Sequence, residues 1–202
     1  MAVPTDIVNI GLRRVGANRI SSLATDTSKE AVCARDLYDE ARRDLLNLHN
    51  WNFAIKRVQL TASATEPAFG WDYAYPLPTD FIRLISAHPH DDDFATVEYR
   101  LEFQSGDDRV LLAQSNQIYI RYVWDIEDAN LMSAAFRDTL AWRLARDFAG
   151  ALSKSAAAAE LAEQAFQRKL SRSKAIDGVE DHPEKMAEGS WITSRFPDTS
   201  RA

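Results

Sequence analysis

Residues 88–93, HPHDDD, form the part of the sequence best suited to metal chemistry. Imidazole and carboxylate groups are common ligands of divalent metal ions, so a metal-dependent hydrolase is one interpretation. The other is a solvated turn, because Pro89 breaks regular structure and adjacent aspartates cannot all face one ion. We expect the turn, without a bound metal.

The other reactive side chains are isolated from one another. Cys33, the only cysteine, falls in a predicted helix with no base beside it, which favours a packed thiol over a nucleophile. His49, close to Trp51, is expected to pack at a helix end. The chain has no glycine-rich phosphate loop, no H-E-x-x-H motif and no nucleophile elbow. We therefore expect no catalytic residue and no cofactor.

A basic cluster near the end of the chain could be a solvated helix end, a phosphate contact or a contact between subunits. The net charge of −6 and the pI near 5.3 disfavour tight duplex binding, because nucleic-acid binders usually carry a basic excess. A helical DNA-binding or regulatory protein nevertheless stays an alternative. The residues of the cluster are Arg168, Lys169, Arg172 and Lys174.

The stretch WDYAYPLPTDFIRL, residues 71–84, could be a ligand pocket or a rigid connector. Two prolines hold the chain extended, and residues 78–80 suit a tight turn. The three aromatics alternate, so they can lie along one strand edge, against a core or against a neighbouring subunit. We expect a structural connector formed by Trp71, Tyr73, Tyr75, Pro76, Pro78 and Asp80.

Composition places the chain among ordinary globular proteins. Of its 202 residues, 46% are hydrophobic and 27% are charged, which is enough apolar material for a core. We find no run of about 18 apolar residues that would predict a membrane span. The first residues lack the basic-then-apolar order of a signal peptide. With one cysteine, synthesis in a reducing cytoplasm is expected.

Helical periodicity predicts helices over residues 6–15 and 28–49. Thr5 is the expected cap of the first helix, and Gly16 suits the position after its end. For the second, Thr27 and Glu30 predict a capping box. Its apolar face repeats through residues 34, 38, 41, 45 and 48. Its polar face is expected to hold Arg35, Asp36, Asp39, Arg42 and Arg43.

Residues 52–125 read as β-structure. A strand is expected over 52–61, and the segments 97–103, 109–113 and 117–124 predict a meander. In the last of these, Ile118 and every second residue after it should face one side, and Tyr119, Arg121 and Val123 the other.

Helical periodicity returns near residue 133, with apolar residues four apart from Phe136 to Phe148. A break at 153–155 and a helix over 156–176 follow, with Gly178 as the expected stop. Residues 178–202 have no period and predict a flexible tail. Spaced apolar residues in it favour docking on a partner, although a tail that folds back on its own domain is equally consistent: Met186, Trp191, Ile192 and Phe196.

These patterns predict an α+β protein. Residues 1–51 and 126–177 would form an antiparallel-type helical bundle domain, and residues 52–125 an inserted antiparallel β-module. Residues 178–202 would extend from it as a flexible tail and possible docking arm.

Four motifs occur in a characteristic order: GANRISSL at 16–23, YDEARRDLL at 38–46, WNFA at 51–54 and LPTDFIR at 77–83. In their order and spacing, the chain resembles the tail tubular protein A family of short-tailed phages. The likeness covers most of residues 5–175 and is least evident after residue 177.

The resemblance implies a structural virion protein and not an enzyme. Such adaptors form a ring, typically of twelve copies, below the portal protein at the head–tail junction. They extend the DNA channel, carry the tail nozzle protein and let genomic DNA pass without sequence-specific binding. An acidic ring would repel DNA phosphates, which suits that role. The tail residues would dock on the portal, and no membrane is involved. A head-completion connector of a longer-tailed phage is the near alternative.

Overall fold

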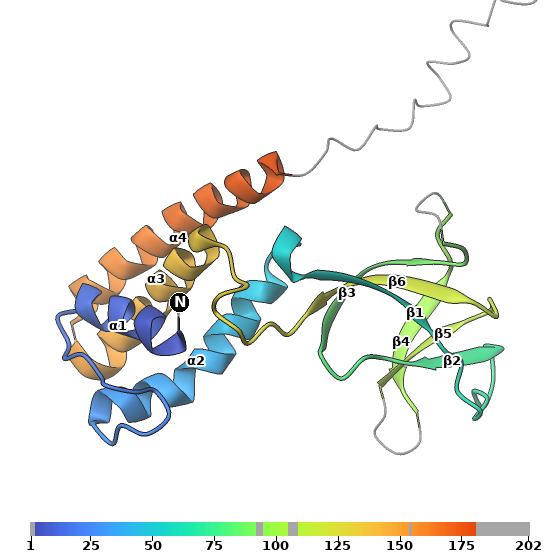
Figure 1. Ribbon diagram of the computed structural model, residues 1–202, viewed down its shortest axis with the longest axis horizontal. Coiled ribbons are helices and arrows are strands. Elements are labelled where there is room, and N and C mark those ends of the chain that lie inside the picture. The colour runs from blue at the N-terminus through green and yellow to red at the C-terminus, as the bar shows by residue number, and fades with distance from the viewer. Residues whose placement is uncertain (1–2, 92–94, 105–108, 154, 181–202) are drawn as a thin grey trace, which may run out of the picture.

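The computed structural model describes residues 3–91, 95–104, 109–153 and 155–180. Helices gather at one end of an elongated molecule and strands at the other (Figure 1). This confirms the predicted α+β class. The helices are α1 (Pro4–Arg14), α2 (Lys29–Asn47), α3 (Ala134–Phe148) and α4 (Ala156–Val179). The strands are β1 (Ile55–Leu60), β2 (Tyr73–Pro76), β3 (Phe81–His88), β4 (Tyr99–Phe103), β5 (Arg109–Ala113) and β6 (Ile118–Trp124).

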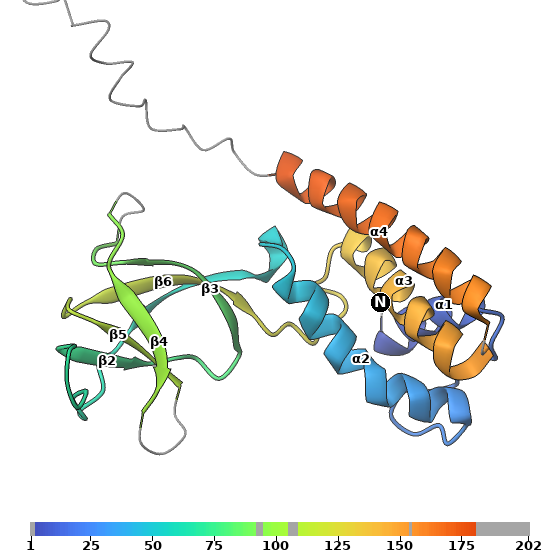
Figure 2. The ribbon, with the colours of Figure 1, turned by 180° about the vertical axis from the view of Figure 1, so that it is seen from behind.

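Helix α3 is the centre of the helical end, since it packs against α1, α2 and α4 (Figure 2). Gly11 allows α1 to approach closely, because a Cβ there would lie 3.1 Å from the Ala141 carbonyl oxygen. Full burial of a large apolar side chain stabilises the fold by about 1.5–3 kcal/mol. The predicted four-residue repeat of α3 is fully buried: Phe136, Leu140, Leu144 and Phe148.

Helix α1 begins two residues earlier than predicted, at Pro4. The Asp6 carboxylate accepts a hydrogen bond from the Val3 N–H at 3.2 Å, which satisfies one free donor at this end. Thr5 does not cap the helix. Its hydroxyl accepts from the Leu23 N–H at 3.1 Å and so holds the following loop against α1. Gly16 follows the helix with a φ of 72°, in the left-handed conformation that glycine favours.

The predicted capping box of α2 is wrong by one residue. Ser28 is the N-cap, and its hydroxyl accepts the Ala31 N–H at 3.3 Å. Glu30 does not reach back to Thr27 but accepts from the side-chain amide of Asn18 at 3.1 Å. Either residue could serve by type, and the loop decides between them: Asp26 Oδ1 accepts the Ser28 N–H at 2.9 Å.

The ends of two helices also differ from the prediction. Helix α2 ends at Asn47, where residues up to 49 were expected, and α4 runs to Val179. Gly178 therefore lies in the last turn of α4. A glycine there costs only about 1 kcal/mol, and Asp177 holds this turn through its bonds to Asn52. The break before α4 is confirmed: a π-helical turn, Ala149–Ser153, leads to the N-cap Ser155.

The predicted meander holds only for its first pair. Strand β4 pairs with β5, but β5 then pairs with β2, whereas β6 lies between β1 and β3. The chain therefore changes sheets between Ala113 and Ile118. A period of two shows which residues share a face and does not encode which strand lies alongside. The predicted strand at 52–61 begins only at Ile55, because Asn52–Ala54 form a 3₁₀ turn.

The two antiparallel sheets share one apolar core. The inward face of β6 supplies Ile118, Ile120 and Tyr122, while Tyr75 and Leu111 come from the other sheet. On the opposite face, Val123 joins the core of the helical end. The predicted alternation of β6 is therefore confirmed.

The capping pattern of α2 makes a direct prediction. We expect Ser28→Ala to lower the free energy of unfolding by about 1 kcal/mol, because it leaves a helix donor unsatisfied. The matched variant Thr27→Ala should change it by less than about 0.5 kcal/mol. Chemical denaturation measures both, and a larger loss in Thr27→Ala would contradict the assignment of the cap.

Candidate functional site

The histidine–aspartate stretch begins in the sheet, because His88 is the last residue of β3, whereas His90 and Asp91 lie beyond the strand and are exposed. The two ring nitrogens of His88 lie 2.8 Å from Ser86 Oγ and 2.7 Å from the Ala95 carbonyl oxygen. Across the part of the chain that the structure describes, no group of three or more His, Cys, Asp or Glu residues could hold a metal ion. Asp92 and Asp93 lie outside that part.

Cys33 and His49 each have a local environment that favours packing over catalysis. Burial raises the pKa of the half-buried Cys33 thiol, and the charges of Asp36 and Asp147 add to the effect. The nucleophilic thiolate is therefore disfavoured. His49 packs edge-on against Trp51, with ring centroids 4.9 Å apart, as expected for a residue at a helix end.

The aromatics of the expected connector divide between two faces. Tyr75 is fully buried between the sheets, and its hydroxyl donates to the Ser115 carbonyl at 2.6 Å. Tyr73 packs beside it, whereas Trp71 packs on the outer side of β2 and β5. The expectation that all three share one edge is therefore wrong, because β2 starts only at Tyr73.

The turn at residues 78–80 joins several elements. The Phe81 N–H donates to the Pro78 carbonyl at 3.0 Å, which confirms the tight turn, and Pro76 closes β2 before it. Asp80 accepts from Lys56 Nζ at 2.6 Å and from the Tyr122 hydroxyl at 3.0 Å. Burial raises the pKa of Asp80, but these two hydrogen bonds outweigh it, and the pKa is lowered overall.

The same turn is bonded to the segment that returns to the helices. The Asp80 carbonyl accepts the Asp125 N–H at 2.7 Å. The Asp125 carboxylate pairs with Arg42 and, at 2.7 Å, with Arg43. Arg42 also donates to the Ile126 carbonyl at 2.8 Å. We call Arg42, Arg43, Asp80, Asp125 and Ile126 the helix–strand junction. These residues connect α2 to the turn between β2 and β3, which belong to different sheets, and to the chain that follows β6.

Arg42 is the main residue that sequence reasoning misplaced. It was expected on the polar face of α2, yet its side chain is only 1% exposed. The signal was present in the spacing, because Arg42 follows the buried Tyr38 by four residues and the buried Ala41 by one. An arginine stem can pack in an apolar stripe when its head finds a carboxylate. That carboxylate is 83 residues away, beyond any local pattern.

Asp177 ties the end of α4 to the corner after α2. Its carboxylate accepts the Asn52 N–H at 3.2 Å and lies 3.1 Å from His49 Nε2, while its carbonyl accepts from the Asn52 side chain at 2.8 Å. Burial is the main cause that raises the pKa of Asp177. The last turn of α4 is thereby fixed next to the start of β1.

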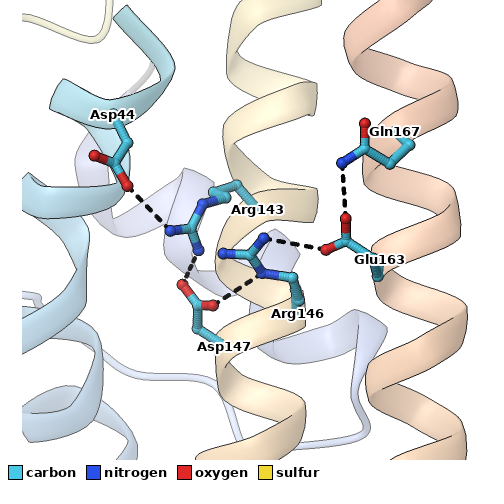
Figure 3. A network of polar contacts seen from close by, with 6 residues as sticks. All are labelled: Asp44, Arg143, Arg146, Asp147, Glu163 and Gln167. Carbon is cyan, nitrogen blue, oxygen red and sulfur yellow. Dashed lines mark hydrogen bonds and ion pairs between the residues drawn. The ribbon is translucent and has the colours of Figure 1, made fainter. Parts of the chain in front are cut away.

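A polar network joins three helices further along the bundle (Figure 3). Arg143 of α3 pairs with Asp147 and, at 3.2 Å, with Asp44 of α2. Arg146 donates to Asp147 and to Glu163 of α4, each at 3.1 Å. Gln167 donates to Glu163 at 2.7 Å and is the main cause of the lowered pKa of that carboxyl.

The basic cluster of α4 is partly engaged in the fold. Lys169 pairs with Asp138 at 2.7 Å, and Arg168 donates to the Gln164 carbonyl at 3.3 Å. Arg172 is exposed and Lys174 is half-buried. The cluster therefore does not act as one set of four free cations. The residues expected to contact the portal lie outside the described residues: Met186, Trp191, Ile192 and Phe196.

Exposed aromatic residues gather at the far end of the strands. A hollow of about 660 Å³ lies between residues 65–71 and strand β4. Phe69 and Phe103 on its rim are 87% and 72% exposed, and Trp71 lines it beside them. Large apolar groups clustered in this way usually mark a contact with another molecule.

The two ion pairs of Asp125, with Arg42 and with Arg43, are expected to differ strongly in their effect on stability. Asp125→Ala would leave the buried Arg42 guanidinium uncompensated, so we expect a loss of about 3 kcal/mol in the free energy of unfolding. Arg43→Ala removes a partner of Asp125 whose side chain is 60% exposed. We therefore expect it to lower the free energy of unfolding by only about 0–1 kcal/mol. Equal losses in denaturant unfolding would contradict the role given to Arg42.

Asp80 predicts a pH dependence. Because its pKa is lowered in the folded state, its stabilising effect is complete above the unfolded pKa of about 3.9 and disappears as pH falls through the lower folded pKa. Asp80→Asn should therefore be less stable than the parent at pH 7, by about 1–2 kcal/mol, with a smaller difference at pH 3. Thermal unfolding at the two pH values measures this, and a constant difference would contradict it.

No described helix has the length and apolarity of a membrane span. A scan of the chain against models of protein families gives no match, and a search of curated proteins also finds no relative of the chain.

Proposed function

We propose that this protein is a structural head-to-tail adaptor of a short-tailed phage, of the tail tubular protein A type. In this proposal, copies of the chain form a ring of twelve below the portal protein, continue the DNA channel and carry the tail nozzle protein. The chain then acts at the head–tail junction of the virion and performs no catalysis.

The observation that carries the proposal is where the resembling motifs lie. The helix at 38–46 supplies Arg42 and Arg43, the corner at 51–54 supplies Asn52, and the segment 77–83 supplies Asp80. Three of the four motifs thus meet where the helices join the strands. The fourth, at 16–23, closes onto α1, where Ile20 exchanges two hydrogen bonds with the Asn9 side chain. The resemblance therefore rests on residues that determine the architecture.

The shape of the molecule supports a role as a connector. Helices and strands occupy opposite ends of the molecule (Figure 2). A subunit in a ring can therefore contact a different partner at each of its two ends. The exposed Phe69 and Phe103 lie at the strand end. At the helical end, Leu161 and Val179 of α4 are 62% and 84% exposed. Both ends thus offer apolar contacts to neighbouring chains.

Binding to the portal tests the proposal. We expect the full chain to form a complex with the portal protein of the same phage, with twelve chains per portal ring, as measured by analytical ultracentrifugation. Because α4 extends to Val179, the tail variant to use is one truncated after Glu180. We expect it to keep its helical circular dichroism signal and melting temperature but to bind the portal at least tenfold more weakly.

A matched control separates the tail from the other apolar contacts. Val32→Ser changes a residue of α2 that is 45% exposed and belongs to none of these apolar contacts, so it should leave portal affinity unchanged. Unaltered affinity of the truncated chain would contradict the role of the tail. Failure of the full chain to bind any portal ring would contradict the adaptor function itself.

A further inference from the structure

Helices α2, α3 and α4 form a layer with two outer edges. Helix α3 packs against both of the others and lies between them (Figure 3). On one side, Arg143 of α3 pairs with Asp44 of α2 at 3.2 Å. On the other side, Arg146 of α3 pairs with Glu163 of α4 at 3.1 Å. The outer faces of α2 and α4 therefore form opposite edges of the layer.

The α4 edge is basic. Its residues Leu161, Arg168, Arg172 and Val179 are all exposed. They follow one another at steps of seven, four and seven residues, which return to the same face of an α-helix and keep the four side chains in one line. Among the described residues, Arg168 donates only to the Gln164 carbonyl of its own helix, and Arg172 has no hydrogen bond or ion pair. Both guanidinium groups are therefore free to meet an acidic partner.

The α2 edge is acidic and has the same spacing of charges. Asp36 and Glu40 are exposed and lie four residues apart. Neither carboxylate has a hydrogen bond or an ion pair within the described part of the chain. Asp39 lies between them and is 70% exposed, with one contact of 3.3 Å to Arg42. The α2 edge, made of Asp36, Asp39 and Glu40, thus presents three carboxylates to solvent.

The arginines beside the α2 edge are engaged elsewhere in the chain. Arg35 donates to the Leu23 and Asp26 carbonyls at 3.1 and 2.6 Å. Arg43 pairs with Asp125 at 2.7 Å. The charges of this edge that still lack a partner among the described residues are therefore carboxylates.

Each edge holds like charges at a spacing that costs stability. Residues four apart on a helix are neighbours, so Asp36 and Glu40 repel each other, and so do Arg168 and Arg172. The two pairs have opposite signs. Contact between an α2 edge and an α4 edge would relieve both repulsions, whereas two copies of the same edge would repel. Because the two edges lie on opposite sides of one chain, a second copy of this chain is the partner that carries the complementary edge.

We propose that the α4 edge of one copy packs beside the α2 edge of the next, with Arg168 next to Asp36 and Arg172 next to Glu40. The equal spacing of the charges lets both ion pairs form in one register. Exposed ion pairs alone add little affinity. The two apolar residues of the α4 edge, one on each side of the arginines, add apolar area to the contact.

The direction of the two helices makes this contact repeatable. Asp177 near the end of α4 bonds to Asn52 in the corner after α2, so both helices point toward the same corner (Figure 1). Helices that run the same way in one chain can pack side by side between chains without turning the next copy over. Such a contact is heterologous, and it closes into a ring when the rotation per copy allows. Closure into a ring rests on the proposed adaptor function, whereas the contact itself needs only two copies of the chain.

Sedimentation velocity of the full chain, over a concentration series at low salt, tests this contact. We expect the parent to form oligomers as its concentration rises, and added salt to weaken them. The double variants Asp36→Arg/Glu40→Arg and Arg168→Glu/Arg172→Glu should each associate at least about tenfold more weakly, because like charges then face each other. Each variant changes only exposed residues and keeps the spacing of like charges, so its circular dichroism signal and melting temperature should match those of the parent.

An exchange of charges between the edges is the decisive arm of the experiment. The chain with all four substitutions keeps the net charge of −6 and should associate to within about threefold of the parent. An equal mixture of the two double variants should also associate, because each basic edge then meets an acidic one. The matched control is Arg19→Glu/Arg100→Glu, which has the net charge of Arg168→Glu/Arg172→Glu but changes exposed residues outside both edges. It should associate like the parent.

Three results would contradict the contact: a parent that stays monomeric throughout the series, a four-residue exchange that does not restore association, and an equal loss in the control. Loss of duplex DNA binding in Arg168→Glu/Arg172→Glu, with unchanged self-association, would assign the two arginines to nucleic acid and refute the contact as well. Portal binding by a parent whose copies do not associate through these edges would refute only this inference. Self-association through the edges without portal binding would refute only the adaptor function.

Discussion

The buried ion pair between Arg42 and Asp125 is the interaction on which the rest of the structure depends. It connects α2, which precedes the strands, with the segment that returns from β6 to α3. The pair also fixes the Asp80 turn, whose carbonyl accepts the Asp125 N–H. Desolvating two charges is costly, so such a pair adds little net stability while it is intact. We infer that its effect is specificity, because other placements of the strands relative to α2 would leave Arg42 unpaired.

The junction also determines how the two ends of the molecule move together. A single connection between helices and strands would act as a hinge. Here the strands are held to α2 through Asp125, to the corner after α2 through the bond of Arg83 to Asn50, and indirectly to α4 through Asn52 and Asp177. Several bonds at separate places resist bending about any one of them. In the proposed adaptor role, such rigidity would help each subunit to align two protein partners around a channel.

Local patterns were sufficient to predict the class of fold and the middle of each helix. Phe136 to Phe148 repeat every four residues and are buried as expected. Features set by particular hydrogen bonds or by strand pairing were not predictable from periodicity. Which of Thr27 and Ser28 caps α2 depends on Asp26 in the loop, and the sheet that β6 joins depends on pairing with β1 and β3.

We propose that this chain forms a ring on a phage portal, and electron microscopy of the chain mixed with its cognate portal protein tests this proposal most directly. We expect a twelve-fold ring of this protein stacked coaxially on the portal, with one continuous channel. Portal particles that stay bare at saturating concentrations of the full chain would contradict it.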